Sequence, residues 1–204
     1  MRRFAGLPTV SLFGAATAVA CLPGPSGPGA DGDGCPGASY PDWGTSAYVL
    51  PYPVGMAYRT GLTNCGGSYH SQGLPDAFAV DFDMPIGSLV TVSRPGVVAY
   101  VEEGGQDYSF PNNLVVVDHG DGSFGEYMHL TESGALVEVG DSVQLGDAIG
   151  YSGATGLAGY PHLHFVVARG DFAWPYESMP VNFRNTEANP RGPAGGTVYE
   201  AKAY

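Results

Sequence analysis

The stretch His162-Leu163-His164-Phe165 alternates two imidazoles with two large apolar side chains. On a β-strand, successive side chains point to opposite faces, so residues two apart share a face and lie roughly 6.6 Å from each other. Leu163 and Phe165 would then enter a core while both imidazoles converge on one side. The alternation therefore predicts a strand over residues 162–168 that presents two histidines to one site. Taken alone, the stretch also fits two surface histidines placed by chance.

A second strand is predicted over Phe78-Ala-Val-Asp-Phe82, with Phe78, Val80 and Phe82 on one face. Asp81 would lie on the other face, and a carboxylate within an apolar strand needs a partner or a metal unless that face is solvated. His70, eleven residues upstream, supplies a third imidazole that could reach the same place. Two histidines and one carboxylate around an open fourth position form a catalytic zinc arrangement.

Short strands separated by glycine turns make up residues 46–184, and no window shows a helical period of 3.6 residues. Strands are predicted over residues 78–82, 97–101, 114–117, 124–130, 142–145 and 162–168. Several strands at this spacing indicate a mostly β fold, a single domain built on an antiparallel β-sheet. Its glycine-rich loops are expected to form a groove.

Two further histidines lie outside the stretches 162–165 and 78–82. His129 belongs to Glu126-Tyr-Met-His-Leu130, where it would share a strand face with Tyr127. His119 lies in the turn sequence His119-Gly-Asp-Gly122, so we expect it to be hydrogen-bonded at the surface rather than catalytic. No His-Glu-x-x-His helix motif occurs, which excludes a glutamate base of that type.

A series of short motifs runs in order through residues 50–183. It comprises His70, Ala79-Val-Asp81, Gly96-Val-Val98, His119-Gly-Asp-Gly122, Tyr127-Met-His-Leu130, Val139-Gly-Asp-Ser-Val143, Gly153-Ala-Thr-Gly156 and Pro161-His-Leu-His-Phe165. Each motif is weak, but the ordered series resembles the lysostaphin-type zinc endopeptidases, which cut peptide cross-bridges in bacterial peptidoglycan.

The resemblance implies a role for each residue of the site. His70, Asp81 and His164 look like the ligands of one Zn²⁺ per chain, and His129 and His162 look like the pair that acts on the attacking water. Imidazoles suit that work because they take and give protons near neutral pH. Tyr127 could donate to the oxyanion, although a packed or solvent-facing role is expected for it.

The sequence departs from the family at three places. Many members separate the first histidine and the aspartate by four residues, whereas here the gap is eleven, and Gly73 and Pro75 indicate an inserted loop. Tyr160 replaces the usual glycine before Pro-His-Leu-His, close to the expected groove, where it would alter substrate fit. Val166 stands where the family usually has glutamate.

Composition excludes several classes of protein. Eight basic against twenty acidic residues give a net charge of −12, which rules out nucleic-acid binding through a basic surface. The same balance argues against adhesion to anionic lipids through basic residues. Residues 140–146 resemble a motif of lipoyl- and biotinyl-type domains, but Lys202 is the only lysine and lies elsewhere, so a carrier domain is excluded.

The N-terminus is predicted to be an export signal over residues 1–20. Arg2 and Arg3 precede an uncharged stretch that ends in the small-residue cleavage site Ala18-Val-Ala20. Cys21 follows directly, as in a bacterial lipobox, and a lipid on Cys21 would tether the chain to a membrane. Plain secretion is the alternative. Both predict an exported protein, either in the cell envelope (periplasmic or a membrane-anchored lipoprotein) or secreted.

The remaining segments follow from composition. Residues 21–45 are predicted to be a Gly/Pro-rich linker, residues 46–185 the zinc endopeptidase domain, and residues 186–204 a flexible C-terminal tail. Cys35 and Cys65 could pair in an oxidising compartment. A metal site that uses both thiols is the alternative, but their spacing lacks the C-x-x-C pattern.

The sequence thus predicts a zinc-dependent endopeptidase that hydrolyses peptidoglycan cross-bridges, with the peptidoglycan peptide as its partner. A non-catalytic cell-envelope activator or scaffold with the same fold is the alternative. Relatives of that kind lose metal ligands or catalytic histidines, and here all five positions are filled. A secreted enzyme that attacks the walls of other cells would share this chemistry and differ in target.

Overall fold

The computed structural model describes residues 34–204 as β-strands joined by loops, with one 3₁₀ helix, η1 (Trp43–Thr45), in that range. The predicted fold class, a mostly β single domain with antiparallel sheets, is confirmed. The predicted signal peptide, Cys21 and the first part of the linker lie outside the described residues. Between residues 34 and 204, no helix has the length and apolar character needed to cross a membrane.

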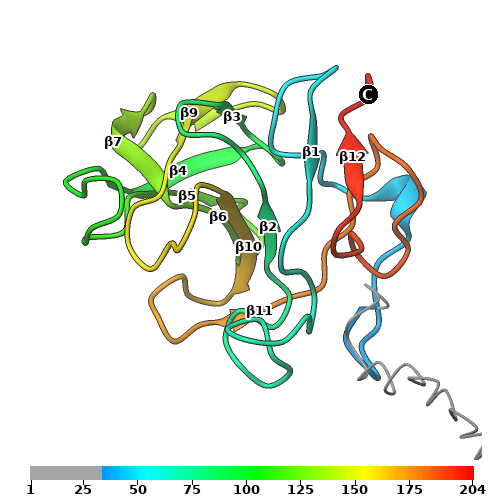
Figure 1. The fold of residues 1–204 in the computed structure, drawn as a ribbon. Coiled ribbons are helices and arrows are strands. Elements are labelled where there is room, and N and C mark those ends of the chain that lie inside the picture. The colour runs from blue at the N-terminus through cyan, green and yellow to red at the C-terminus, as the bar shows by residue number, and fades with distance from the viewer. Residues whose placement is uncertain (1–33) are drawn as a thin grey trace, which may run out of the picture.

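Three antiparallel sheets make up the fold (Figure 1). The largest runs in the order β11 (Glu177–Ser178), β10 (Leu163–Arg169), β6 (Ser123–Met128), β5 (Leu114–Asp118), β4 (Gly96–Glu102) and β8 (Ser142–Val143), and β2 (Val80–Phe82) also pairs with β10. The second consists of β3 (Leu89–Thr91), β9 (Ala148–Ser152) and β7 (Leu130–Ala135), and the third of β1 (Ala57–Arg59) and β12 (Val198–Glu200).

Strand β10 lies in the middle of the molecule and is covered on both faces (Figure 1). Leu163, Phe165 and Val167 enter the main core, as the alternation predicts. Val166 and Ala168 point the other way, into a smaller apolar cluster with Ala79 and Tyr176. Burial of both faces explains why β10 continues after His164 as an unbroken apolar run, Phe165 to Ala168.

The strand predicted over residues 124–130 is interrupted. β6 ends at Met128 and β7 begins at Leu130, because His129 between them adopts a left-handed backbone conformation with φ of 63°. The prediction that His129 and Tyr127 share a strand face is therefore wrong. Tyr127 is fully buried in the main core, where its hydroxyl accepts a hydrogen bond of 2.7 Å from the Ser93 N–H.

The position of Phe78 also differs from the predicted one. The chain is still turning at this point, since the Ala79 N–H donates to the carbonyl oxygen of Asp76 at 2.9 Å, and β2 begins only at Val80. Phe78 consequently packs beside Cys35, Cys65 and Ala77 instead of joining the face of Val80 and Phe82.

The C-terminal segment, expected to be a flexible tail, packs against the domain. β12 pairs with β1 in register, with Tyr199 opposite Tyr58. Tyr199 and Ala201 are buried in the main core, and the Tyr52 hydroxyl donates to the carbonyl oxygen of Tyr199 at 2.8 Å. Apolar burial by these alternate residues offsets the entropy lost when the segment is ordered.

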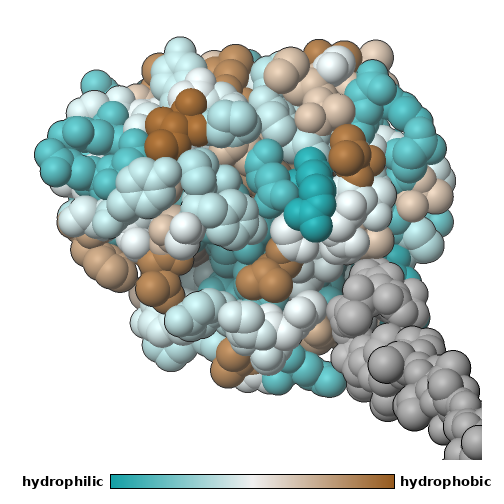
Figure 2. All heavy atoms as spheres, in the orientation of Figure 1, coloured by the Kyte–Doolittle hydropathy of each residue, from teal (hydrophilic) through white to brown (hydrophobic). Residues whose placement is uncertain are grey.

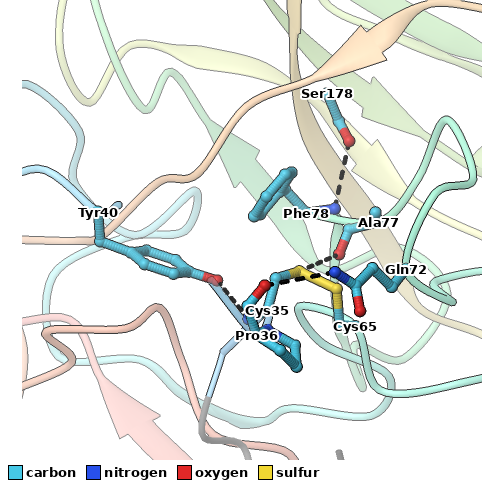
Figure 3. Close-up of a disulfide and its surroundings, with 8 residues drawn as sticks. All are labelled: Cys35, Pro36, Tyr40, Cys65, Gln72, Ala77, Phe78 and Ser178. Atoms are coloured by element: carbon cyan, nitrogen blue, oxygen red, sulfur yellow. Dashed lines mark hydrogen bonds between the residues drawn. A yellow bond between two sulfur atoms is a disulfide. The ribbon is translucent and has the colours of Figure 1, made fainter. Parts of the chain in front are cut away.

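A disulfide joins Cys35 to Cys65, which confirms the predicted pairing (Figure 3). The Cys35 N–H donates to the Tyr40 hydroxyl at 3.0 Å. On the other side of the bridge, the Cys65 N–H donates to the carbonyl oxygen of Ala77 at 2.7 Å. The described part of the expected linker is thereby fastened to the loop that precedes β2.

Replacing both Cys35 and Cys65 by serine is expected to lower the free energy of unfolding by about 3–4 kcal/mol, on chain-entropy grounds, for a bridge that spans 30 residues. Urea unfolding of the oxidised protein and of the double variant measures this difference. A reductant should destabilise the wild type by a similar amount and leave the double variant unchanged. Equal midpoints for the two oxidised proteins would contradict the prediction.

Candidate metal centre

His164 and Asp81 face each other across two paired strands. β10 and β2 pair in an antiparallel register that sets His164 directly opposite Asp81. Directly opposed residues of such a pair point to the same face of the sheet. The Nδ1 atom of His164 lies 2.9 Å from Oδ1 of Asp81 as a result.

The His70 ring joins this pair from the loop before β2. A turn in which the His70 N–H donates to the carbonyl oxygen of Gly67, at 3.0 Å, sets its position. Its Nε2 atom lies 3.5 Å from Oδ1 of Asp81. One ligand atom from each of His70, Asp81 and His164 lies within 4.8 Å of the other two, and all three residues are buried. The arrangement is a buried set of two imidazoles and one carboxylate that could hold a metal ion.

His129 and His162 complete a cluster of four histidines around Asp81. His162 precedes β10 and forms an isolated bridge with Gly153, while His129 lies at the break between β6 and β7. The ring centroids of these two residues are 4.7 Å apart, and that of His129 is 5.6 Å from that of His164. Nε2 of His162 lies 3.7 Å from Oδ1 of Asp81.

Backbone carbonyls fix the tautomers of His129 and His162. Nδ1 of His129 lies 2.8 Å from the carbonyl oxygen of Thr155, and Nδ1 of His162 lies 2.8 Å from that of Tyr160. A carbonyl oxygen can only accept, so each Nδ1 carries a hydrogen. When the rings are neutral, each Nε2 has a free lone pair. The Tyr160 ring stacks on His162 with centroids 4.6 Å apart.

The left-handed conformation of His129 is maintained by its neighbours. Its backbone N–H donates to Oδ1 of Asn112 at 3.0 Å, and the same oxygen lies 3.0 Å from its Nδ1. A non-glycine residue in this conformation costs of order 1 kcal/mol or more, and such strain is typical of functional sites. Here it turns the imidazole out of the strand and toward His162.

Electrostatics fit the binding of a cation by this cluster. Burial, with contributions from His164 and His162, lowers the pKa of His129 to about 3. Burial also lowers the pKa of His70, so both rings are neutral at pH 7. Burial alone would lower the pKa of His164 too, but Asp76 and Asp81 outweigh it and raise that pKa above its usual value. His70 is thus a neutral imidazole donor beside the carboxylate of Asp81, and a metal ion bound at His164 would displace a proton from that ring.

The five residues singled out from the sequence thus lie together: His70, Asp81, His129, His162 and His164. His119 lies apart, as expected, with Nδ1 2.9 Å from the carbonyl oxygen of Pro95. Sequence reasoning missed three residues that support the cluster, namely Asn112, Thr155 and Asp76. Thr155 belongs to a motif noted in the sequence, whereas nothing in the local pattern marks Asn112 or Asp76.

The buried carboxyl of Glu126 is expected to make the stability of the fold depend on pH. Its side chain is buried, and among residues 34–204 its Oε1 atom has no hydrogen-bond partner. Burial raises the pKa of Glu126 to about 8. Between its ordinary value of 4.5 and pH 8, the folded protein holds a proton that the unfolded chain has released. The free energy of unfolding must therefore fall as the pH rises through this window.

Glu126→Gln removes this titration, and we expect the variant to exceed the wild type in stability by roughly 2–4 kcal/mol above pH 8, with little difference near pH 5. Urea unfolding of both proteins at pH 5, 7 and 9, with chelator present throughout, measures the difference. Parallel pH curves for the two proteins would show that Glu126 does not carry this proton.

Comparisons with known proteins identify the family and the fold. The sequence profile of peptidase family M23 matches residues 77–178. Among curated proteins, none matches the chain. Pseudoalterin, an M23 metalloprotease from the deep sea, has a similar solved structure, with a TM-score of 0.53 and 17% identity over 76% of this chain and 99% of that one. At this identity, the likeness shows the fold.

Two further solved structures are similar over parts of longer proteins. Lysostaphin of Staphylococcus simulans is 31% identical, with a TM-score of 0.49 over 66% of this chain and 51% of that one. A zinc-containing peptidase of Vibrio cholerae is 26% identical, with a TM-score of 0.49 over 66% of this chain and 39% of that one. This chain therefore spans about half of lysostaphin and less of the Vibrio protein.

Proposed function

Because this chain belongs to peptidase family M23, we propose that it is a zinc-dependent endopeptidase that hydrolyses the peptide cross-bridges of bacterial peptidoglycan. The observation that carries the proposal is the convergence of five side chains on one buried point. His70, Asp81 and His164 supply three ligand atoms, and the Nε2 atoms of His129 and His162 stand beside them.

We assign one Zn²⁺ per chain to His70, Asp81 and His164. Three nitrogen and oxygen ligands with a fourth position left for water or substrate are typical of catalytic zinc sites. When bound, zinc polarises the scissile carbonyl group and brings the pKa of water toward neutrality. The fit rests on donor chemistry, since His70 is neutral at pH 7 and the carboxylate of Asp81 faces both imidazoles.

His129 and His162 would move the protons of the reaction. A free Nε2 lone pair accepts a proton from the attacking water, and the same Nε2–H then donates it to the nitrogen of the leaving amine. Both Nδ1 atoms stay bound to the carbonyl oxygens of Thr155 and Tyr160 throughout, which keeps each Nε2 directed at the reacting atoms.

Recognition of the peptide is proposed to be short-range. A net charge of −12 gives no long-range attraction to an anionic wall. Hydrophobic residues on the face shown in Figure 2 form small groups among hydrophilic ones. Tyr108, Phe110 and Leu157 are exposed on the two loops that also hold His129, and these loops are joined where the Gly156 N–H donates to the carbonyl oxygen of Ser109 at 2.7 Å. Such side chains would contact a bound peptide.

Export from the cytoplasm is part of the same proposal. The signal-like residues 1–20 and the peptidoglycan substrate both require it. The Cys35–Cys65 disulfide supports it, because disulfides persist mainly in oxidising compartments.

Mass spectrometry of digested peptidoglycan tests the function. Purified walls with glycine-rich and with direct cross-links are incubated with the zinc-loaded chain, beside a control with chelator. New peptide ends that disappear with chelator are expected, and their masses identify the bond. Stoichiometric zinc without cleavage would exclude both bonds as substrates. A chain that neither binds zinc nor cleaves the walls would favour a non-catalytic envelope protein.

A further inference from the structure

We propose that Asp76 is a positioning residue of the metal centre. It contacts Nε2 of His164 and so orients this ring with its Nδ1 atom toward Asp81 and His70. The inference rests on the zinc site proposed above. It concerns a residue in the inserted loop between His70 and Asp81, where no sequence motif indicates a function.

The two nitrogens of His164 meet two different carboxylates. Nδ1 lies 2.9 Å from Oδ1 of Asp81, and Nε2 lies 3.3 Å from Oδ1 of Asp76. A metal ion bound by Nδ1 leaves the hydrogen of the ring on Nε2. Carboxylates that accept this hydrogen orient the ring and strengthen it as a ligand in many metal sites.

Nε2 of His164 depends on Asp76 for a partner. Nε2 of His164 and Oδ1 of Asp76 are close enough for an ion pair but are not aligned as a regular hydrogen bond. Among residues 34–204, no other acceptor forms a hydrogen bond with this buried nitrogen. Glu126 is the other buried carboxyl in the neighbourhood, yet it makes no ion pair with His164 in the described chain.

Asp76 is itself held in place. The Tyr176 hydroxyl donates to Oδ1 of Asp76, the same oxygen that faces His164. Tyr176 directly precedes β11, which pairs with the far end of β10. The neighbouring Phe78 N–H donates to Oγ of Ser178, in β11, at 3.2 Å (Figure 3). The inserted loop is thus attached at two points, to Tyr176 just before β11 and to Ser178 within it, with Asp76 at the first attachment.

Charge supports the same role. Asp81 and Asp76 together place two negative charges on the two sides of His164, and Asp76 is 9% exposed. A buried carboxylate is costly unless it is paired. A divalent cation on Nδ1 makes the ring a stronger donor from Nε2, so metal binding and the contact with Asp76 reinforce each other.

Zinc affinity, measured by competition with a chromophoric chelator, tests the inference without reference to activity. Asp76→Ala is expected to weaken zinc binding by roughly 10–100-fold. Asp76→Asn, which keeps the shape and an acceptor oxygen but loses the charge, should fall between Asp76→Ala and the wild type. Glu126→Gln changes a buried carboxyl that makes no ion pair with His164 among residues 34–204, and this variant should bind zinc like the wild type.

Unfolding with and without zinc separates positioning from general damage. In a positioning role, the Asp76 variants lose part of the stabilisation that zinc adds, as weaker binding of a ligand to the folded state requires. If Asp76→Ala does not fold, Asp76→Asn gives the same comparison. Wild-type zinc affinity in Asp76→Asn and in any folded Asp76→Ala would overturn the inference and leave the proposed function intact. A wild-type chain that binds no zinc would overturn both.

Discussion

Replacing Asp81 by alanine is expected to remove the bound zinc and to lower kcat/KM for peptidoglycan by about a thousandfold or more. Asp81 is the only carboxylate of the proposed ligand set, and its Oδ1 atom faces His70 and His164 at 3.5 and 2.9 Å. Without it, two neutral imidazoles remain to hold a dication. Elemental analysis of the purified variant gives the zinc content, and wall digestion gives the rate.

Asp83→Asn is the matched control for this substitution. Asp83 lies two residues further along, where it pairs with Arg59 at 2.8 Å. This control should keep both zinc and activity. Stoichiometric zinc in Asp81→Ala would contradict the assigned ligands. It would point instead to the second possible metal group in the described chain, His129, His162 and His164.

Replacing His129 by alanine is expected to lower kcat by roughly 10²–10⁴-fold while one zinc per chain stays bound. The substitution removes an imidazole whose Nε2 lone pair is free for the attacking water, but it leaves His70, Asp81 and His164 in place. Steady-state cleavage and zinc content, measured on the same preparation, separate the two effects.

His119→Ala is the control for His129→Ala. His119 is hydrogen-bonded to the carbonyl oxygen of Pro95 and lies outside both possible metal groups of residues 34–204. Activity close to that of the wild type is expected. If His129→Ala lost its zinc, His129 would be a metal ligand, which would contradict the assignment of His70, Asp81 and His164 as the full ligand set.

Local alternation was enough to predict the centre of the site. Leu163 and Phe165 enter the core, and the same two-residue period directs His164 to the face that Asp81 shares across the strand pair. Such a pattern is visible in sequence because burial of one face constrains every second residue. The mostly β, antiparallel class followed from the same reasoning.

Features that depend on distant partners could not be predicted in this way. The turn at His129 requires Asn112 and Thr155, which lie 17 and 26 residues away in the chain. β12 pairs with β1, and although Val198 and Tyr199 favour strands, three residues are too few to mark a strand in the sequence. Asp76 is positioned by contacts with Tyr176 and His164, which lie far from it in the chain and so leave no local pattern in the sequence.

The pairing of β1 with β12 affects how this chain can be recombined with other members of its family. The segment around β1 runs beside β2, because the Gly61 N–H donates to the carbonyl oxygen of Asp81 at 2.8 Å. β12 supports β1 from the other side. A chimaera cut at residues 77 and 178, the limits of the family match, would lose His70, both halves of the disulfide and this two-strand support. The transferable unit therefore extends from Cys35 to Ala201, and crossover points for domain shuffling belong outside it.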